Sequence, residues 1–126
     1  MRQNVSSNSP FEPVVGFSRA VRVGGSVFVS GTVGRGDDGN VVAGGVYEQA
    51  AQSIRNIEAA LNMAGASLAD VVRTRIYLVD MDTQDDASRA HREAFGEIKP
   101  AATLVEVSRL ASPEMLVEIE ADAIVE

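Results

Sequence analysis

The chain has no cysteine, and His91 is its only histidine. The absence of cysteine excludes thiol nucleophiles and thiolate metal sites, and it fits a protein of a reducing compartment. A lone histidine has no second histidine, cysteine or adjacent serine with which to complete a metal site or a catalytic triad. We therefore expect no metal and no other cofactor, and the helical spacing of His91 with Ala87, Ala94 and Ile98 favours a role in helix packing.

Positive charge is also scarce, because 11 Lys and Arg residues stand against 18 Asp and Glu residues, a formal net charge of −7. Nucleic-acid binding depends on clustered Lys and Arg side chains that displace counterions from phosphates. No segment approaches the roughly 18 apolar residues of a membrane span. Residues 1–13 lack the basic start and apolar run of a secretory signal. We expect a cytoplasmic protein whose partners include neither nucleic acid nor a membrane.

What the chain does have is the composition of an ordinary globular protein, with 45% hydrophobic and 23% charged residues. A length of 126 residues suits one compact core. We predict a single domain over residues 1–126.

Two short β-rich segments open the regular structure. Residues 17–23 and 26–30 are separated by Gly24 and Gly25, a pair suited to the tight turn of a hairpin. Residues 31–45 then collect glycine, aspartate and asparagine, which indicates a surface loop. This loop has no lysine, so it lacks the Lys-Ser or Lys-Thr pair of a phosphate-binding Walker loop.

Helical and strand patterns alternate after this loop. Helical periodicity begins at Val46, and Gly65 stands where a left-handed cap is expected. Residues 71–79 alternate as a strand, and a second helix begins after a cap at Asp82 or Thr83 and ends before Pro100. Two strands follow in residues 101–126. The apolar stripe of the first helix is predicted to be Ala50, Ile54, Ile57, Leu61 and Ala64, and the core face of the strand to be Val72, Thr74, Ile76 and Leu78.

The order β-β-α-β-α-β-β predicts an α+β fold in which both helices pack on one face of the sheet. The opposite face is predicted to be polar, because carboxylates alternate with apolar residues along the last strand. This face is either solvated or forms an oligomer interface with polar clefts. Its predicted members are Arg73, Arg75, Glu106, Glu118 and Glu120.

Four segments carry a family resemblance. They are residues 29–31 (VSG), 65–75 (GASLADVVRTR), 105–110 (VEVSRL) and the stretch from Glu118 to Ala121. With them the chain resembles the RidA (YjgF/UK114) family from about Ser9 to Val125. The resemblance implies a chorismate-mutase-like (RidA/YjgF) fold with a mixed sheet, a homotrimer, and hydrolysis of imines or enamines in clefts between subunits.

The resemblance also assigns site residues. It implies that backbone groups of Gly31 and Leu104 bind the substrate and that Glu118 positions the attacking water. Glu118 has a second reading from its position on the strand, as an ion-pair partner of Arg73 or Arg75.

Three positions depart from the family pattern. Ala102 stands where the family has the arginine that grips the substrate carboxylate, Phe17 where it has a tyrosine, and Arg89 where it has an asparagine. Loss of a bidentate guanidinium weakens capture of a free carboxylate by about two to four orders of magnitude. Arg89 either replaces the missing charge from its helix or pairs with Asp85 or Asp86 on the surface.

Two functions follow from these residues. The first is a divergent imine or enamine deaminase-like hydrolase that acts on a small molecule between subunits and differs from a standard 2-iminopropanoate deaminase because of Ala102. The second is a non-catalytic trimer that binds a small ligand or regulates in the same cleft. A ribonuclease label has also been attached to parts of the family, but an acidic chain with one histidine does not favour it.

Overall fold

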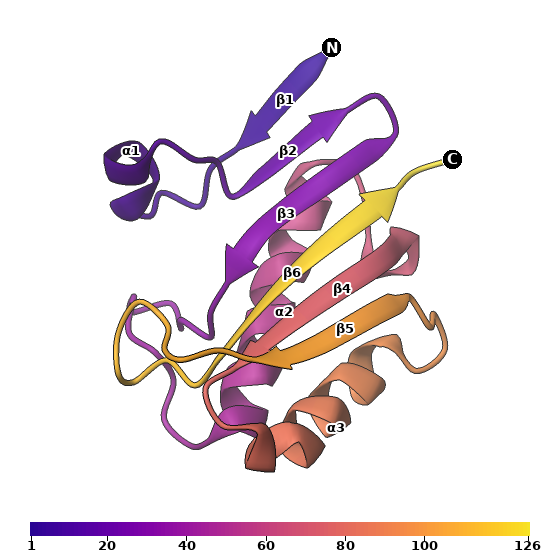
Figure 1. The fold of residues 1–126 in the computed structure, drawn as a ribbon. Helices are drawn as coiled ribbons and strands as arrows, with labels where there is room; N and C mark the ends of the chain where they lie inside the picture. The colour runs from indigo at the N-terminus through magenta and orange to yellow at the C-terminus, as the bar shows by residue number, and fades with distance from the viewer.

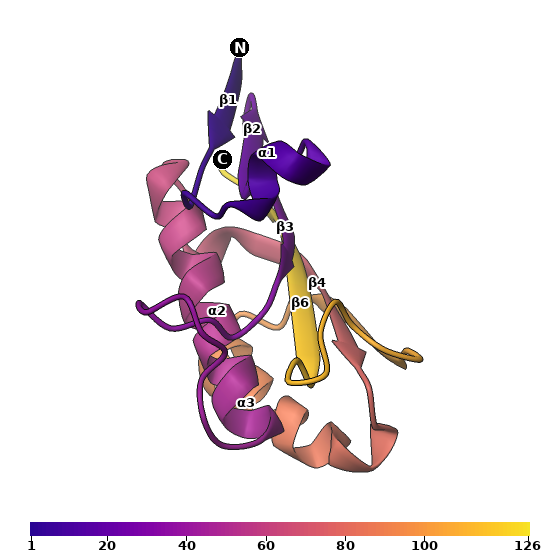
Figure 2. The ribbon, with the colours of Figure 1, turned by 90° about the vertical axis from the view of Figure 1, so that its left-hand side faces the viewer.

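The computed structural model of residues 1–126 is built on one six-stranded sheet with the strand order β1-β2-β3-β6-β4-β5. The two long helices, α2 and α3, cover the same face of this sheet and leave the other face open (Figures 1 and 2). No helix has the length and apolar character needed to cross a lipid bilayer. The strands are β1 (Arg2–Val5), β2 (Ala20–Val23), β3 (Ser26–Thr32), β4 (Val71–Leu78), β5 (Ala101–Glu106) and β6 (Val117–Ile124), and the helices are α1 (Phe11–Val15), α2 (Val46–Met63) and α3 (Gln84–Phe95), with 3-10 turns η1 (Leu68–Asp70) and η2 (Met81–Thr83).

The α+β fold class and the one-sided packing of the helices are confirmed. Gly24 has a φ of 59° in the β2–β3 hairpin, and Gly65 has a φ of 80° just after α2, so both glycines adopt the left-handed conformation that their positions predict. The apolar stripe of α2 is buried as expected. Only β4 and β5 run parallel, which makes the sheet mixed.

The N-terminal elements β1 and α1 were not predicted, and the first strand of the predicted hairpin, β2, begins at Ala20 rather than at residue 17. Strand β1 is short and polar and pairs with β2 at the sheet edge. Helix α1 is held by the buried carboxylate of Glu12, which accepts hydrogen bonds from Ser6 Oγ at 2.9 Å and from the Ser7 amide at 3.1 Å. Because these contacts join residues across a turn, hydrophobic periodicity does not reveal them.

The prediction that Val72 faces the core is wrong. The pairing of β4 with β6 shifts register between Val71 and Arg73, which is a β-bulge. Val71 is therefore buried at 3% exposure, whereas Val72 is 44% exposed. The remainder of β4 alternates as predicted, with Thr74, Ile76 and Leu78 in the core.

The position of Glu106 is a second correction. Strand β5 pairs with β4 in parallel, so Glu106 stands beside buried Leu78 on the face that carries the helices. Its Oε1 accepts a hydrogen bond from the Met81 amide at 2.8 Å. The same register places Ala102 beside Thr74 and Leu104 beside Ile76, also on the helix-bearing face.

Candidate functional site

Gly31 and Glu118 meet on the open face of the sheet. Gly31 lies in β3 at the point where its pairing with β6 is irregular, and Glu118 alternates with buried Val117 and Ile119 in β6. A Cβ atom built on Gly31 would lie 2.1 Å from Glu118 Oε2. Only glycine therefore permits this close approach of the carboxylate to the β3 backbone.

Arg19 joins this pair, and sequence reasoning missed it. Its Nη1 donates hydrogen bonds to the Gly31 carbonyl and to Thr32 Oγ1, both at 3.0 Å, and its guanidinium carbon lies 5.3 Å from the centroid of the Phe17 ring. Arg19 Nε is buried without a hydrogen-bond partner. We call Phe17, Arg19, Gly31 and Glu118 the Glu118 half-site. The only sequence feature that could have indicated Arg19 as a site residue is its position two residues after Phe17, close to the start of a strand.

The surroundings of Glu118 favour the protonated form of its carboxyl group. Burial raises the pKa of Glu118 above its ordinary value, nearby Arg19 lowers this pKa, and Glu120 raises it, with the burial effect the largest. The result is a pKa above the ordinary value, in the direction that suits a general base working near neutral pH.

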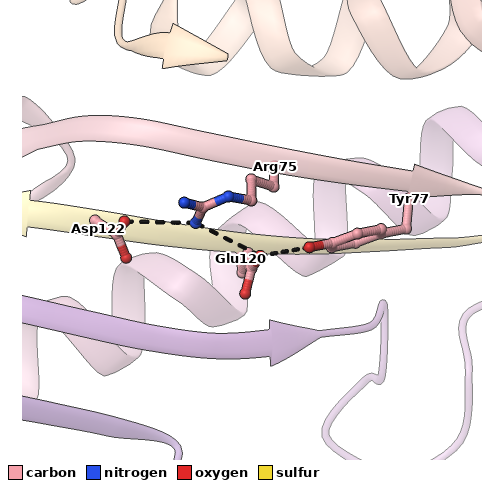
Figure 3. Close-up of polar contacts among 4 residues, drawn as sticks. All are labelled: Arg75, Tyr77, Glu120 and Asp122. Carbon is pink, nitrogen blue, oxygen red and sulfur yellow. Dashed lines mark hydrogen bonds and ion pairs between the residues drawn. The ribbon is translucent and has the colours of Figure 1, made fainter. Parts of the chain in front are cut away.

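The neighbouring charges on the open face are mostly paired with one another (Figure 3). Arg75 Nη1 lies 3.6 Å from Glu120 Oε1 and 3.5 Å from Asp122 Oδ2, and the Tyr77 hydroxyl donates to Glu120. Glu118 has no ion pair with Arg73 or Arg75 within 4.0 Å. Glu118 therefore does not form the ion pair with Arg73 or Arg75 that its position on the strand suggested.

Ala102 and Leu104 belong to a second region, between β5 and α3. There the β5 residues face Ser88, His91 and Arg92 across a hollow of about 200 Å³, which we call the α3–β5 hollow. His91 lies next to the sheet, as a packing role predicts. Its Nε2 is 2.8 Å from Thr74 Oγ1 and its ring centroid is 4.8 Å from that of Phe95.

The two regions do not meet within one chain. The Glu118 half-site lies on the open face over β3 and β6, whereas the α3–β5 hollow lies on the helix-bearing face at the β5 edge, with β4 between them. Gly31 lies beside Glu118, and Ala102 and Leu104 line the same hollow. These two pairs of residues are separated from each other in one chain. A cleft that uses all four residues requires a second copy of the chain.

Arg89 does not reach Ala102 in this chain. Its Nη2 lies 3.7 Å from Asp86 Oδ1, and its guanidinium carbon lies 3.6 Å from the centroid of the Tyr47 ring. Tyr47 belongs to α2, so Arg89 points toward the other long helix. Of the two alternatives for Arg89, the pairing with Asp86 is the one seen, and Arg92 is the arginine beside Ala102.

Comparison with known proteins shows the family of this chain. The family model described as Endoribonuclease L-PSP matches residues 7–125. The crystal structure of Rv2704 from Mycobacterium tuberculosis, described as a member of the YjgF/YER057c/UK114 family, has a TM-score of 0.91 and 50% sequence identity, and the match covers 99% of this chain and 100% of that one. This chain belongs to the YjgF/YER057c/UK114 family.

Other members of the YjgF/YER057c/UK114 family are similar over most of their length. A RutC family protein of Pyrococcus abyssi is 42% identical over 89% of this chain and 88% of its own. A Mus musculus protein named 2-iminobutanoate/2-iminopropanoate deaminase is 31% identical over 98% of this chain and 92% of its own. Some relatives in the family thus carry a deaminase name.

The three positions predicted to depart from the family pattern do not lie together in the chain. Phe17 belongs to the Glu118 half-site, and Ala102 lines the α3–β5 hollow, while Arg89 is outside both in this chain. No group of three or more His, Asp or Glu side chains is placed to hold a metal ion.

Substitution of Arg19 is expected to change the titration of Glu118. The positive charge of Arg19 lowers the pKa of the Glu118 carboxyl group, so Arg19→Gln should raise this pKa further and leave less carboxylate at a given pH. The carboxyl carbon of Glu118, followed by NMR from acid to neutral pH, measures this shift. Arg19→Lys keeps the charge and should titrate close to wild type, and equal pKa values in the wild type and Arg19→Gln would contradict the coupling.

Proposed function

We propose that this protein is a cytoplasmic homotrimer that hydrolyses a small imine or enamine in clefts between its subunits. The observation that supports it best is the position of Glu118, partly buried with a raised pKa and held against the backbone of Gly31. The deaminase name of relatives that align over nearly the whole chain supports the same reaction class.

Glu118 supplies the proton acceptor in the proposed reaction. The oxygen of a water molecule bonds to the imine carbon while one proton of that water passes to the Glu118 carboxylate. Glu118 then passes this proton to the imine nitrogen, which gives a carbinolamine. As the carbonyl forms and the C–N bond breaks, Glu118 accepts the hydroxyl proton and delivers it to the departing nitrogen, so that ammonia leaves and the carboxylate is restored. The net change is imine plus water to carbonyl compound plus ammonia, with no oxidant or reductant. Backbone groups of Gly31 and Leu104 hold the polar end of the substrate.

The proposed substrate differs from 2-iminopropanoate. The methyl of Ala102 offers no hydrogen-bond donor for a carboxylate bonded directly to the imine carbon, and Phe17 adds a ring without a hydroxyl. A substrate without a carboxylate at that position fits these side chains better.

The proposed assembly explains why the two regions are separate in one chain. In a trimer, the β5 edge of one subunit can approach the Glu118 half-site of the next. The open face also exposes apolar side chains among its charges, with Phe28 at 50% and Val105 at 39% exposure. Such a mixed face is typical of a surface that is covered by a partner.

A trapping assay tests the function. An amino-acid oxidase generates 2-iminopropanoate, a flavin-dependent amine oxidase generates imines without a carboxylate, and semicarbazide captures whatever escapes hydrolysis. We expect this protein to leave the capture of 2-iminopropanoate unchanged and to reduce the capture of at least one other imine or enamine. Unchanged capture across the whole panel would contradict the hydrolase and favour the non-catalytic ligand-binding trimer, for which the loss of an arginine at Ala102 is the supporting observation.

A further inference from the structure

The α3–β5 hollow is open because position 102 carries only a methyl group. The parallel register directs Ala102 toward α3, where Ser88, His91 and Arg92 form the facing wall. The volume of about 200 Å³ is enough for a small charged group with a short aliphatic stem. A larger side chain at position 102 would occupy this space.

Arg92 provides an unpaired positive charge at this hollow. Its guanidinium makes neither a hydrogen bond nor an ion pair in the chain, whereas Arg75 and Arg89 both pair with carboxylates. Arg73 and Arg109 are also unpaired, but of these three arginines only Arg92 lines the α3–β5 hollow. Guanidinium groups bind carboxylates through paired, charge-assisted hydrogen bonds.

His91 provides a second donor on the same wall. Thr74 is fully buried, and its hydroxyl lies 2.8 Å from His91 Nε2. When this hydroxyl donates to Nε2, the ring proton resides on Nδ1, for which the chain offers no acceptor. In this tautomer an imidazole N–H and a guanidinium both line the hollow and are available to one small anion.

We propose that the α3–β5 hollow is an anion subsite in which Arg92, assisted by His91, binds a carboxylate of the substrate that is several bonds away from the carbon attacked by water. The inference rests on the proposed function for the location of that carbon. In a 2-imino acid the carboxylate is bonded to the reacting carbon, at the cleft itself. Arg92 lies on α3, on the wall of the hollow that faces Ala102, so a carboxylate held there is farther from the β5 backbone at Leu104 than one held by a side chain at position 102 and needs a longer stem. The proposed substrate is therefore an imine or enamine that also carries a carboxylate several bonds away from its reacting carbon.

Two isomeric keto acids test this distance directly. 2-Oxopentanoate and 4-oxopentanoate have the same formula and charge and differ in the separation between carbonyl and carboxylate. His91 is the only histidine, so its ring signals in the NMR spectrum report binding at this hollow without overlap. We expect 4-oxopentanoate to shift the His91 signals at a concentration at least about tenfold lower than 2-oxopentanoate, and neutral 2-pentanone to leave them in place.

Arginine variants identify the residue that binds the carboxylate. Arg92→Gln is expected to weaken 4-oxopentanoate binding by about 10- to 100-fold, whereas Arg55→Gln, on the exposed side of α2, should bind like the wild type. Arg92 is in the last turn of α3, where a positive charge also stabilises the helix, so the melting temperature of each variant is measured alongside. Loss of binding in Arg89→Gln with retention in Arg92→Gln would overturn the proposal.

Two further variants keep the proposal testable if Arg92→Gln folds poorly. Ala102→Leu fills the hollow without a charge and should abolish the preference for 4-oxopentanoate. Ala102→Arg should reverse the preference toward 2-oxopentanoate. No change in either variant would overturn the subsite.

Failure of this inference and failure of the proposed function give different results. Glu118→Gln should keep the preference between the two keto acids, because Glu118 lies outside the hollow. A protein that prefers 4-oxopentanoate but hydrolyses no imine retains the subsite and loses the proposed reaction. A protein that hydrolyses a neutral enamine but binds both keto acids equally retains the reaction and loses the subsite.

Discussion

Glu118→Gln is expected to slow imine or enamine hydrolysis by about 10²- to 10⁴-fold. Glutamine preserves the shape of the side chain beside Gly31, but its amide does not accept a proton from water at neutral pH. The measurement is the rate of substrate loss in the trapping assay at saturating protein. Glu120→Gln is the matched control, because Glu120 is on the same strand but is engaged by Arg75 and Tyr77, and it should retain most of the activity.

The same substitution is expected to increase stability at neutral pH. Burial raises the folded-state pKa of Glu118 above its unfolded value, so the stability that this group contributes is present below the unfolded pKa and is lost as the pH rises through the folded pKa. Glu118→Gln removes this loss. Its free energy of unfolding should therefore exceed that of the wild type at pH 7, by no more than about 1 kcal/mol, with the two converging in acid. Urea unfolding at several pH values measures the difference.

Lower activity combined with equal or higher stability would assign Glu118 to function rather than to the fold. Active sites commonly keep groups in environments that cost stability. A variant that loses activity and stability together at pH 7 would contradict this assignment and indicate that Glu118 mainly holds β3 and β6 together.

The sequence predicted those parts of the fold that depend on local patterns. The stripe of α2, the hairpin at Gly24 and the left-handed Gly65 follow from periodicity and turn chemistry within a few residues. Strand β1 was missed because it is short and polar, and helix α1 because Glu12 holds it through serine contacts. Val72 was misplaced because a β-bulge depends on the partner strand.

The sequence named residues that the fold brings together in pairs, but it did not indicate which neighbours their side chains contact. The resemblance selected Gly31 and Glu118, which the sheet brings together from strands far apart in the sequence. It gave no sign of Arg19, whose hydrogen bond to the Gly31 carbonyl depends on the β2–β3 pairing. On α3 it selected Arg89, whereas the hollow beside Ala102 is lined by Arg92. Residues three positions apart in a helix lie on the same face, about 60° apart around the axis, so the rotation of α3 about its axis decides which one faces β5.

Gly31→Ala is expected to lower activity by about 100-fold while the fold is retained. The added Cβ would lie 2.1 Å from Glu118 Oε2 and 2.9 Å from its Cδ, so the carboxylate must move away from the backbone that it contacts. Gly31 does not have a positive φ, so alanine brings no backbone strain. Gly36→Ala is the matched control, since its Cβ would meet nothing closer than 3.5 Å and Gly36 also lacks a positive φ.

The double variant Gly31→Ala, Glu118→Gln distinguishes a local effect from a general one. If alanine acts by displacing the Glu118 carboxylate, it has nothing left to disturb once that carboxylate is replaced by an amide. The double variant should then be no less active than Glu118→Gln alone, a strong departure from additivity. Fully additive losses would mean that Gly31 acts through its own backbone contacts with the substrate and not through Glu118. Because Arg19 Nη1 bonds the Gly31 carbonyl at 3.0 Å, the same comparison in an Arg19→Gln background would then show whether that carbonyl must be held in place for hydrolysis.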